Sequence, residues 1–286
     1  MTGAEAGAGA APLRELRWTA QGHQYFMSCL KLIDDCRLEG PSALPGWSGR
    51  HLLSHVGHNA RALARLAHWA ATGEPTPMYP SPSARAEEID TGARWPVPRL
   101  RDFVEEEQDR LVAELDRIID ERWQADVVTA QGRTVPASTI PWLRSRELWI
   151  HACDLPSAGD LRSSCDPPSS CGDFAAMPDD FVDALISDAL TRRRTVHSCD
   201  LRVRATDRDT GREQTGPVRT GPVPTGREQT GPVQTGPVRT GRAETYAAET
   251  YVQGSAADLA RWLTGRGASP RLRTAAGELP ELPPWL

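Results

Sequence analysis

The sequence has almost no lysine, no excess of basic charge and no long apolar run. Lys31 is its single lysine, and 33 basic residues against 38 acidic ones give a net charge of −5. Without a basic excess the chain lacks the charge that holds a nucleic-acid backbone, so we expect no nucleic-acid partner. The apolar runs fall far short of the roughly 20 residues that span a bilayer, and the N-terminus has no signal-peptide pattern. We therefore expect a cytoplasmic protein with no membrane partner.

The cysteines also lack any Cys-x-x-Cys pair, although there are six of them. A chain of 286 residues can bury a core without a disulfide framework, so we expect reduced thiols. At about 150 residues per domain, this length predicts roughly two domains. With 39% hydrophobic and 25% charged residues, most of the chain is typical of a globular protein.

Helices dominate the first half of the chain, because apolar residues recur there at helical spacing. The predicted helices span 13–36, 48–72, 84–91, 98–123 and 138–154. Ser48 and Gly73 are suited to cap the second of these, and a short hairpin or extended crossover is expected over 127–135. Four substantial helices with one irregular crossover predict a four-helix bundle.

The second half has a different composition and predicts a smaller domain. A helix is expected over 179–194, a strand over 199–206 and a helix over 255–264. Together the two halves predict an α+β protein. Its parts are a disordered tail over 1–12, a helical bundle over 13–157, a linker over 158–177 and a small α/β domain over 178–286.

A pentapeptide repeat interrupts that second domain. Residues 210–244 form seven pentads that begin Thr-Gly, and most of them read TGREQ or TGPVR. Valine is the only large apolar residue in this tract, so the tract cannot bury enough surface to offset its ordering entropy. We interpret it as a disordered loop, with a binding module as the alternative. It is either inserted in a loop of the α/β domain or has replaced part of the sheet.

Glu147 and His151 are the strongest candidates for a functional site in the sequence. Their i, i+4 spacing places both side chains on one face of the last helix of the bundle. The second helix offers His51, His55 and His58 for a third ligand. Two imidazoles and one carboxylate suit a divalent ion such as zinc with an open coordination position, which a catalytic site needs. The alternative is a solvent-facing pair and a histidine-rich polar surface, since such spacings also arise by chance.

Three segments carry a resemblance to a known family. They read WSGRHLLSHVGHNA over 47–60, MYPS over 78–81 and PWLRSRELWIHACDL over 141–155. In this order they resemble the mycothiol-dependent maleylpyruvate isomerases, members of the DinB-like metalloenzyme superfamily. The resemblance covers residues 13 to about 160 and resumes more weakly at 251–266. It implies a DinB-like four-helix bundle.

This resemblance implies a site residue by residue. His55, Glu147 and His151 match the metal ligands of the family, and Arg85 matches the arginine beside the metal that activity requires. His51 matches a recurring histidine one turn before the ligand, which we take either as structural or as a support for the ligands. The residues that bind the cofactor stay unassigned.

The roles of three more residues near these ligands can be considered from the sequence. Asn59 lies one turn beyond His55, and we expect it to face the same pocket. Arg144 lies either on the metal face or at the surface as a helix-end charge. Asp154 either orients a ligating imidazole or ends the helix.

The reaction implied by the resemblance is a metal- and mycothiol-dependent cis–trans isomerisation of maleylpyruvate to fumarylpyruvate, as in gentisate-type aromatic degradation. The mycothiol thiol adds to the double bond, the resulting single bond rotates, and elimination restores the trans alkene. A metal favours the thiolate, and Arg85 pairs with a carboxylate of the small diacid substrate. The oligomeric state stays open, with a monomer among the possibilities.

Two other functions remain open. A mycothiol S-transferase would use the same metal and thiol against another electrophile, with addition and no elimination. A non-catalytic metal-binding bundle protein would keep only the scaffold, since fold does not imply function. The pentad tract departs from the family pattern, and this departure bears on full activity more than on metal binding.

Overall fold

The computed structural model describes residues 10–156, 172–194, 201–208, 214–215, 250–275 and 277–282. The chain divides into two units, residues 1–178 and residues 179–286. Helices make up most of the described chain and the sheets are small, so the predicted α+β class is confirmed. Within these ranges no helix is both long and apolar enough to cross a membrane.

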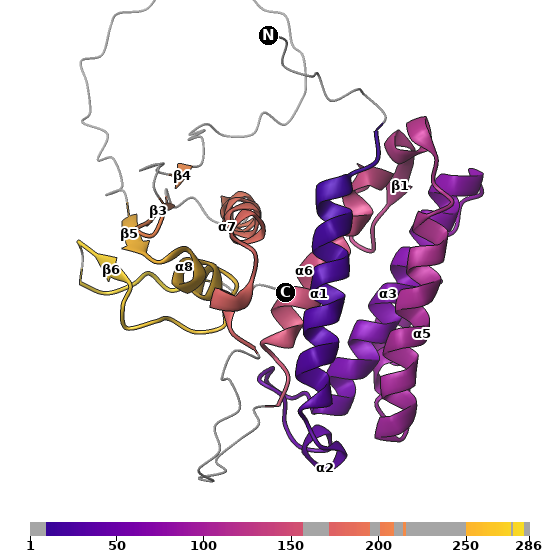
Figure 1. The fold of residues 1–286 in the computed structure, drawn as a ribbon, viewed down its shortest axis with the longest axis horizontal. Coiled ribbons are helices and arrows are strands. Elements are labelled where there is room, and N and C mark those ends of the chain that lie inside the picture. The colour runs from indigo at the N-terminus through magenta and orange to yellow at the C-terminus, as the bar shows by residue number, and fades with distance from the viewer. Residues whose placement is uncertain are drawn as a thin grey trace, which may run out of the picture. The chain divides into compact units, whose positions relative to one another are not determined.

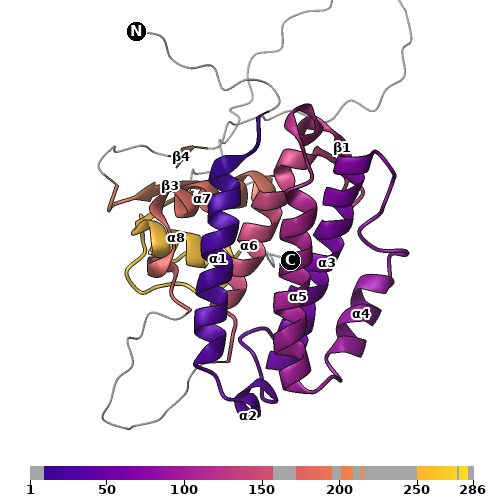
Figure 2. The same ribbon diagram turned by 45° about the vertical axis from the view of Figure 1, so that its right-hand side comes forward.

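The first unit is helical. Its four long helices, α1, α3, α5 and α6, lie side by side, and the shorter α4 packs beside α3 (Figures 1 and 2). The helices are α1 (Leu13–Lys31), α2 (Asp35–Leu38), α3 (Gly49–Thr72), α4 (Ala84–Gly92), α5 (Val97–Leu115) and α6 (Ile140–Ala152). Two short strands form the predicted hairpin. They are β1 (Asp126–Val128) and β2 (Thr134–Pro136), which pair antiparallel.

Helix α3 begins and ends where its capping residues predict. The Ser48 hydroxyl accepts a hydrogen bond from the His51 backbone N–H, and the Ser48 N–H donates to Nδ1 of His51. This reciprocal pair satisfies donors that the first turn of a helix leaves free. At the other end Gly73 takes a left-handed conformation with φ +82°, which glycine adopts without a steric penalty.

Two predicted helices are shorter than expected. The first ends at Lys31 rather than near residue 36, and the Arg101 guanidinium on α5 donates to the carbonyls of Leu30 and Ile33 at that end. The fifth ends at Leu115 rather than near residue 123. Asp120 has φ +34°, which cannot continue a right-handed helix, and the chain turns there into a 3₁₀ segment. In the first case a contact with a distant side chain, and in the second the local backbone conformation, overrides the apolar periodicity.

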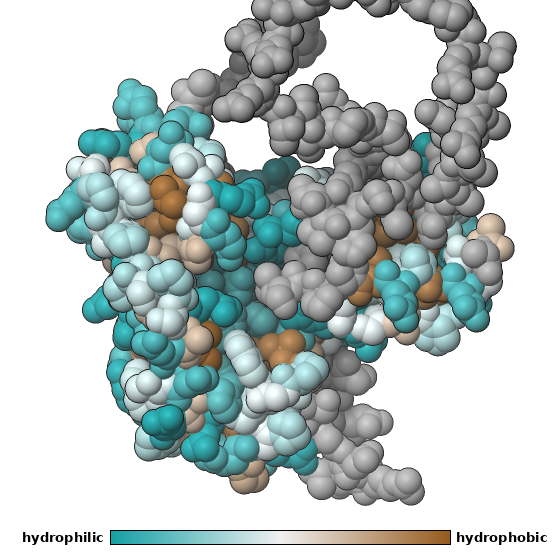
Figure 3. All heavy atoms as spheres, turned by 180° about the vertical axis from the view of Figure 1, so that it is seen from behind, coloured by the Kyte–Doolittle hydropathy of each residue, from teal (hydrophilic) through white to brown (hydrophobic). Residues whose placement is uncertain are grey.

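The core of the first unit consists of two apolar clusters along the four long helices. Gly57 allows the Phe103 ring of α5 to pack directly against α3, because an added Cβ there would collide with that ring. The outer surface is mainly hydrophilic with isolated apolar spots on the face that Figure 3 shows. The strongly exposed large apolar side chains are scattered along the unit, at Leu13, Leu32, Val112 and Ile119. The helices therefore turn their apolar stripes inward, as amphipathic helices do.

The second unit combines two helices with a four-stranded sheet in the order β4-β3-β5-β6. Its elements are α7 (Asp179–Arg194), β3 (Leu201–Ala205), β4 (Gln214–Thr215), β5 (Thr250–Gly254), α8 (Ala256–Leu263) and β6 (Arg273–Thr274). Strands β3 and β5 run parallel, and the two outer strands pair antiparallel with them. Strand β3 thus has a neighbour on each side. Strand β4 belongs to the pentad tract, and the rest of residues 210–244 lies outside the described residues.

Apolar and ionic contacts hold the second unit together. Val203 and Val252, paired in register on β3 and β5, are fully or almost fully buried, as is Leu259 of α8. Arg208, which follows β3, forms ion pairs with Asp179 and Asp183 at the start of α7. These ion pairs fasten the first turns of α7 to the end of the strand.

Three cysteines lie in the part of the chain that the structure describes, and none of them forms a disulfide. Cys29 is buried, Cys36 is exposed and Cys153 is half-buried. Cys165, Cys171 and Cys199 lie outside the described residues, as does the predicted N-terminal tail up to residue 9.

Candidate metal centre

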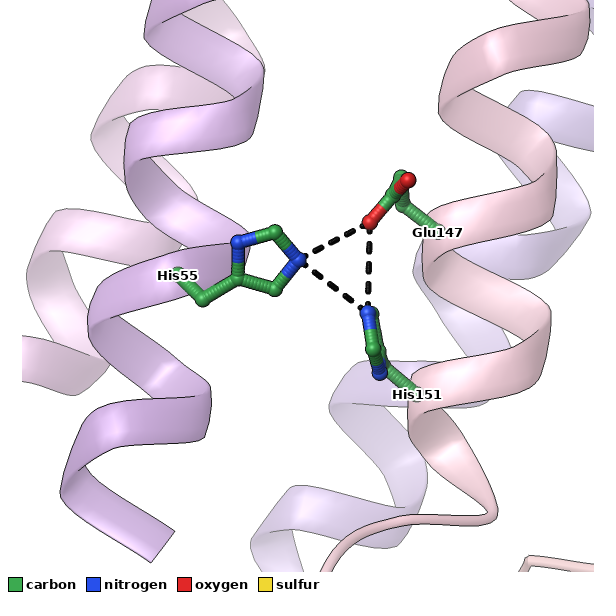
Figure 4. Close-up of side chains that lie close together, drawn as sticks. All are labelled: His55, Glu147 and His151. Atoms are coloured by element: carbon green, nitrogen blue, oxygen red, sulfur yellow. Dashed lines mark hydrogen bonds and ion pairs between the residues drawn. The ribbon is translucent and has the colours of Figure 1, made fainter. Parts of the chain in front are cut away.

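Three potential metal ligands meet between α3 and α6. Figure 4 shows His55 on one helix and Glu147 and His151, one turn apart, on the facing helix. His55 Nε2 lies 2.9 Å from Glu147 Oε2 and 3.1 Å from His151 Nε2. The third edge, from His151 Nε2 to Glu147 Oε2, is 3.2 Å. The structure therefore brings together the three residues that the sequence singled out.

Asp154 fixes the third of these side chains. Nδ1 of His151 lies 2.7 Å from Oδ2 of Asp154, and both side chains are almost fully buried. A carboxylate only accepts, so Nδ1 carries a hydrogen, and Nε2 is the ring nitrogen that faces His55 and Glu147. Of the two roles considered for Asp154, the structure shows the one that orients an imidazole. It has the pattern of an outer-shell carboxylate in metal sites.

Burial and close contact shift the titration of all three groups. Burial lowers the pKa of His55 to about 4, against the opposing effect of Glu147. Burial alone would raise the pKa of Glu147, but hydrogen bonds from His151 and His55 hold it well below the usual range. Burial would lower the pKa of His151, yet its bonds to Asp154 and Glu147 raise it. Glu147 is consequently a carboxylate.

The donor set and its spacing fit one divalent ion. Zinc takes nitrogen and oxygen ligands at about 2.0–2.2 Å in tetrahedral geometry, so two ligands of one ion stand roughly 3.3 Å apart. The three edges of 2.9, 3.1 and 3.2 Å come close to that separation. Two imidazole nitrogens facing each other at such a distance also need a cation or a shared proton between them. The three residues thus form a site that can bind a divalent metal.

Arg85 lies at the edge of this site. Its residue is exposed on α4, and Nη2 lies 3.4 Å from Nδ1 of His55. This places a guanidinium fork beside the cluster with much of its surface accessible to solvent. Such a fork matches the two oxygens of a carboxylate.

Arg144 lies neither at the surface nor at a helix end, so the prediction of a surface charge at the end of the helix is wrong. Its side chain is fully buried and donates to Oε1 of Gln108, to the carbonyl of Val56 and to Oδ1 of Asn59. Burial lowers its pKa to about 10, and the negative charge of Glu147 opposes that shift. Arg144 on α6 therefore joins that helix to α3 and α5 through hydrogen bonds. Asn59 is occupied in the same network.

His51 and His58, the other two ligand candidates on α3, have structural contacts. His51 caps the helix through Ser48, as expected for a structural residue. His58 contacts the hydroxyl and carbonyl of Ser54 and packs 4.8 Å, centroid to centroid, from the Phe103 ring. Neither belongs to the cluster of ligand atoms. His51 lies one turn before His55 and contacts Ser48, whereas His58 is directed toward Ser54 and Phe103.

Two aromatic residues near the site were not predicted from the sequence. The Trp47 ring meets the His55 ring edge-on, with 5.4 Å between centroids. Tyr79 is half-buried, and burial raises its pKa to about 12, while Arg85 and Glu147 act on its hydroxyl with opposite charges. Trp47 lies directly before the N-cap of α3, so the signal in the sequence was its nearness to His55 along the chain. Tyr79 lies in an irregular loop, and its proximity to the site depends on the tertiary fold.

Comparisons with known proteins agree with this architecture. The sequence model of the mycothiol maleylpyruvate isomerase N-terminal domain matches residues 19–156. A crystal structure of a mycothiol-dependent maleylpyruvate isomerase is 31% identical and superimposes with a TM-score of 0.76, covering 96% of this chain and 98% of that chain. A histidine-to-alanine mutant of such an enzyme is 30% identical, with a TM-score of 0.75 and the same coverage. No curated protein sequence matches significantly.

Fold and site together define a DinB-like helical unit with a metal-binding cluster, joined to a small α/β unit. The 31% sequence identity to a solved isomerase, over nearly the full length of both chains, assigns the protein to one family within this class. The chain belongs to the mycothiol-dependent maleylpyruvate isomerase family, which is a family of enzymes.

Proposed function

We propose that this protein is a metal- and mycothiol-dependent cis–trans isomerase that converts maleylpyruvate to fumarylpyruvate. The observation that carries the proposal is the meeting of His55, Glu147 and His151 in a chain that shares 31% identity with such an isomerase over 96% of its length. We assign the metal centre to a four-helix domain over residues 13–157 and treat residues 178–286 as its α/β partner.

His55, Glu147 and His151 would hold the metal, and we propose zinc because two imidazoles and a carboxylate suit it. A divalent ion held by three protein ligands supplies Lewis acidity at its open position, which lowers the pKa of a thiol near it. Asp154 keeps the hydrogen on Nδ1 of His151, so that Nε2 stays available as a ligand. Glu147 contributes the single negative charge of the set.

Mycothiol supplies the nucleophilic sulfur whose reversible addition to a conjugated alkene permits rotation about the former double bond. Arg85 would bind a carboxylate of the diacid substrate and hold its reacting carbons beside the metal centre. Its solvent-accessible position next to His55 supports this role. Tyr79 is half-buried, and burial raises its pKa to about 12, so its hydroxyl stays protonated at neutral pH.

The direct test is an absorbance assay of maleylpyruvate isomerisation with zinc-loaded protein. We expect turnover that needs mycothiol and that is lost after treatment with a chelator and restored by added zinc. Turnover without mycothiol would contradict the proposal. Accumulation of a stable mycothiol adduct in place of fumarylpyruvate would instead indicate an S-transferase.

A further inference from the structure

Trp47 occupies a fixed position beside the metal centre. It directly precedes the N-cap of α3, stacks on His51 with 6.5 Å between centroids and meets the edge of His55 at 5.4 Å. The side chain is only partly buried, so some of the indole surface remains accessible. An accessible tryptophan that touches a metal-ligand candidate is a binding surface at the rim of the site.

The loop that carries Trp47 is held rigidly. The Trp47 N–H donates to the carbonyl of Leu44, and the Trp47 carbonyl accepts from both the N–H and the hydroxyl of Ser42. The N–H of Ala43 donates to the carbonyl of Asp154 across 3.0 Å. Because Asp154 also holds His151, the loop and the metal centre share one support. Little conformational freedom remains for the indole to lose when a ligand binds.

The site has two chemically different sides around His55. Arg85 approaches Nδ1 of the imidazole and makes a charged side. Trp47 meets the ring of the same imidazole and brings no charge. Arginine guanidinium groups lie over the faces of Trp18 and Trp95, whereas the ring contacts of Trp47 within the described ranges are with imidazoles. An anionic ligand group belongs at Arg85, and an uncharged group with an apolar face belongs at Trp47.

We propose that Trp47 is the platform on which the sugar portion of the thiol cofactor packs, an inference that rests on the proposed function. Mycothiol carries its cysteine thiol on a glucosamine linked to inositol. When its sulfur reaches the metal centre, these rings must lie at the rim of the site. The C–H faces of a sugar ring pack against the electron-rich face of an indole, which leaves Arg85 free for the diacid.

The test compares two thiols on matched variants by isothermal titration calorimetry of zinc-loaded protein. The thiols are mycothiol and N-acetylcysteine, which lacks the sugars. The variants are Trp47→Phe, Trp47→Leu and the control Trp69→Leu, whose indole is also partly buried on α3 but packs against the other apolar cluster. Zinc content is measured for each protein, so that a damaged metal centre is recognised.

We expect Trp47→Leu to lower the ratio of mycothiol affinity to N-acetylcysteine affinity roughly tenfold, as loss of a tryptophan anchor commonly does. Trp47→Phe, which keeps an aromatic face, should restore part of the ratio and also serves if the leucine variant does not fold. Trp69→Leu should leave the ratio unchanged. Equal weakening of both thiols, or an unchanged ratio in both Trp47 variants, would overturn the platform.

The measurement also separates this inference from the proposed reaction. Binding needs no turnover, so a protein that binds mycothiol through Trp47 but does not isomerise maleylpyruvate would contradict the reaction alone. An active isomerase whose preference for mycothiol is unchanged by substitution of Trp47 would contradict only the proposed role of Trp47.

Discussion

His151 and Asp154 are joined by a hydrogen bond of 2.7 Å from Nδ1 to Oδ2, and the backbone carbonyl of Asp154 also accepts from Ala43. One residue thus sets the tautomer of an imidazole in the metal centre and ties the end of α6 to the loop before α3. Since His55 follows that loop, Asp154 links both halves of the centre. Metal binding and the rim that carries Trp47 therefore depend on a common support.

Replacement of Asp154 should weaken metal binding without removing any ligand. Asp154→Asn loses the negative charge that favours a hydrogen on Nδ1 of His151, so we expect zinc affinity to fall roughly 10- to 100-fold. Chelator competition measures that affinity. Asp102→Asn, an exposed change on α5, is the matched control and should bind zinc as the original protein does. Equal affinities for the two variants would contradict the role of Asp154.

The three-ligand assignment predicts opposite results for two histidines one turn apart. His55→Ala removes one of the three metal ligands and should abolish stoichiometric zinc in the purified protein, as measured by metal analysis. His51→Ala should retain zinc but lower the free energy of unfolding by about 1 kcal/mol, because the cap of α3 is lost. Retention of zinc by the His55 variant would show that the centre binds metal in another way.

Arg85 should affect turnover and leave metal binding intact. Arg85→Ala removes the guanidinium beside His55 but no ligand atom. We expect a loss of maleylpyruvate turnover by roughly two orders of magnitude or more, since a misplaced substrate can lose that much rate, with full zinc content. Arg94→Ala, another exposed arginine that follows α4, should remain active. An Arg85→Ala enzyme with full turnover would exclude the carboxylate-binding role.

The buried guanidinium of Arg144 should contribute strongly to stability. Arg144→Ala leaves the acceptors on Gln108, Val56 and Asn59 without their donor, and each such group costs about 1–3 kcal/mol. We expect a total loss above about 3 kcal/mol in urea unfolding. Arg99→Ala breaks an ion pair whose arginine is 45% exposed, and it should cost at most about 1 kcal/mol. Similar losses for the two variants would contradict this account.

Acid should destabilise the protein partly through His23. Burial lowers its pKa from 6.5 to about 4, with Arg144 lowering it further and Asp109 opposing. Its Nε2 is buried and has no hydrogen-bond partner within the described ranges. The folded state therefore binds the proton less readily than the unfolded state. The contribution of neutral, buried His23 to the free energy of unfolding is complete above pH 6.5 and is lost as the pH falls toward 4.

His23→Leu should accordingly flatten the pH dependence of unfolding between pH 6.5 and 4. Thermal unfolding of the chelator-treated protein at several pH values measures the effect, so that metal release does not contribute. His55 still titrates in that range, so we expect a smaller acid slope rather than none. An unchanged slope would mean that His23 is already solvated.

The predictability of the fold differs from one element to the next. The bounds of α3 followed from Ser48 and Gly73, because caps and a left-handed glycine act over a few residues of backbone. The end of α1 did not follow, because Arg101, 70 positions further along, satisfies the carbonyls of Leu30 and Ile33. The ends of elements that depend on distant partners cannot be read from local periodicity.

The candidate site divides in the same way. The i, i+4 spacing of Glu147 and His151 put both on one face of a helix, since helical geometry alone fixes that relation. Which of His51, His55 and His58 meets them was left to the family resemblance, because the answer depends on how α3 is rotated and shifted along its axis against α6. Only packing places His55 within 3.1 Å of His151. The hidden position of Arg144 likewise depends on acceptors from two other helices.

The sequence by itself determined the helical character of the first unit, the capping of α3 and the pairing of a carboxylate with a histidine on α6. Each of these depends on residues within one or two turns. The tertiary structure decided the orientation of His151 by Asp154, the burial of Arg144 and the contact of Trp47 with His55. These interactions join residues on different elements or depend on burial, and burial exists only once the helices have packed against one another.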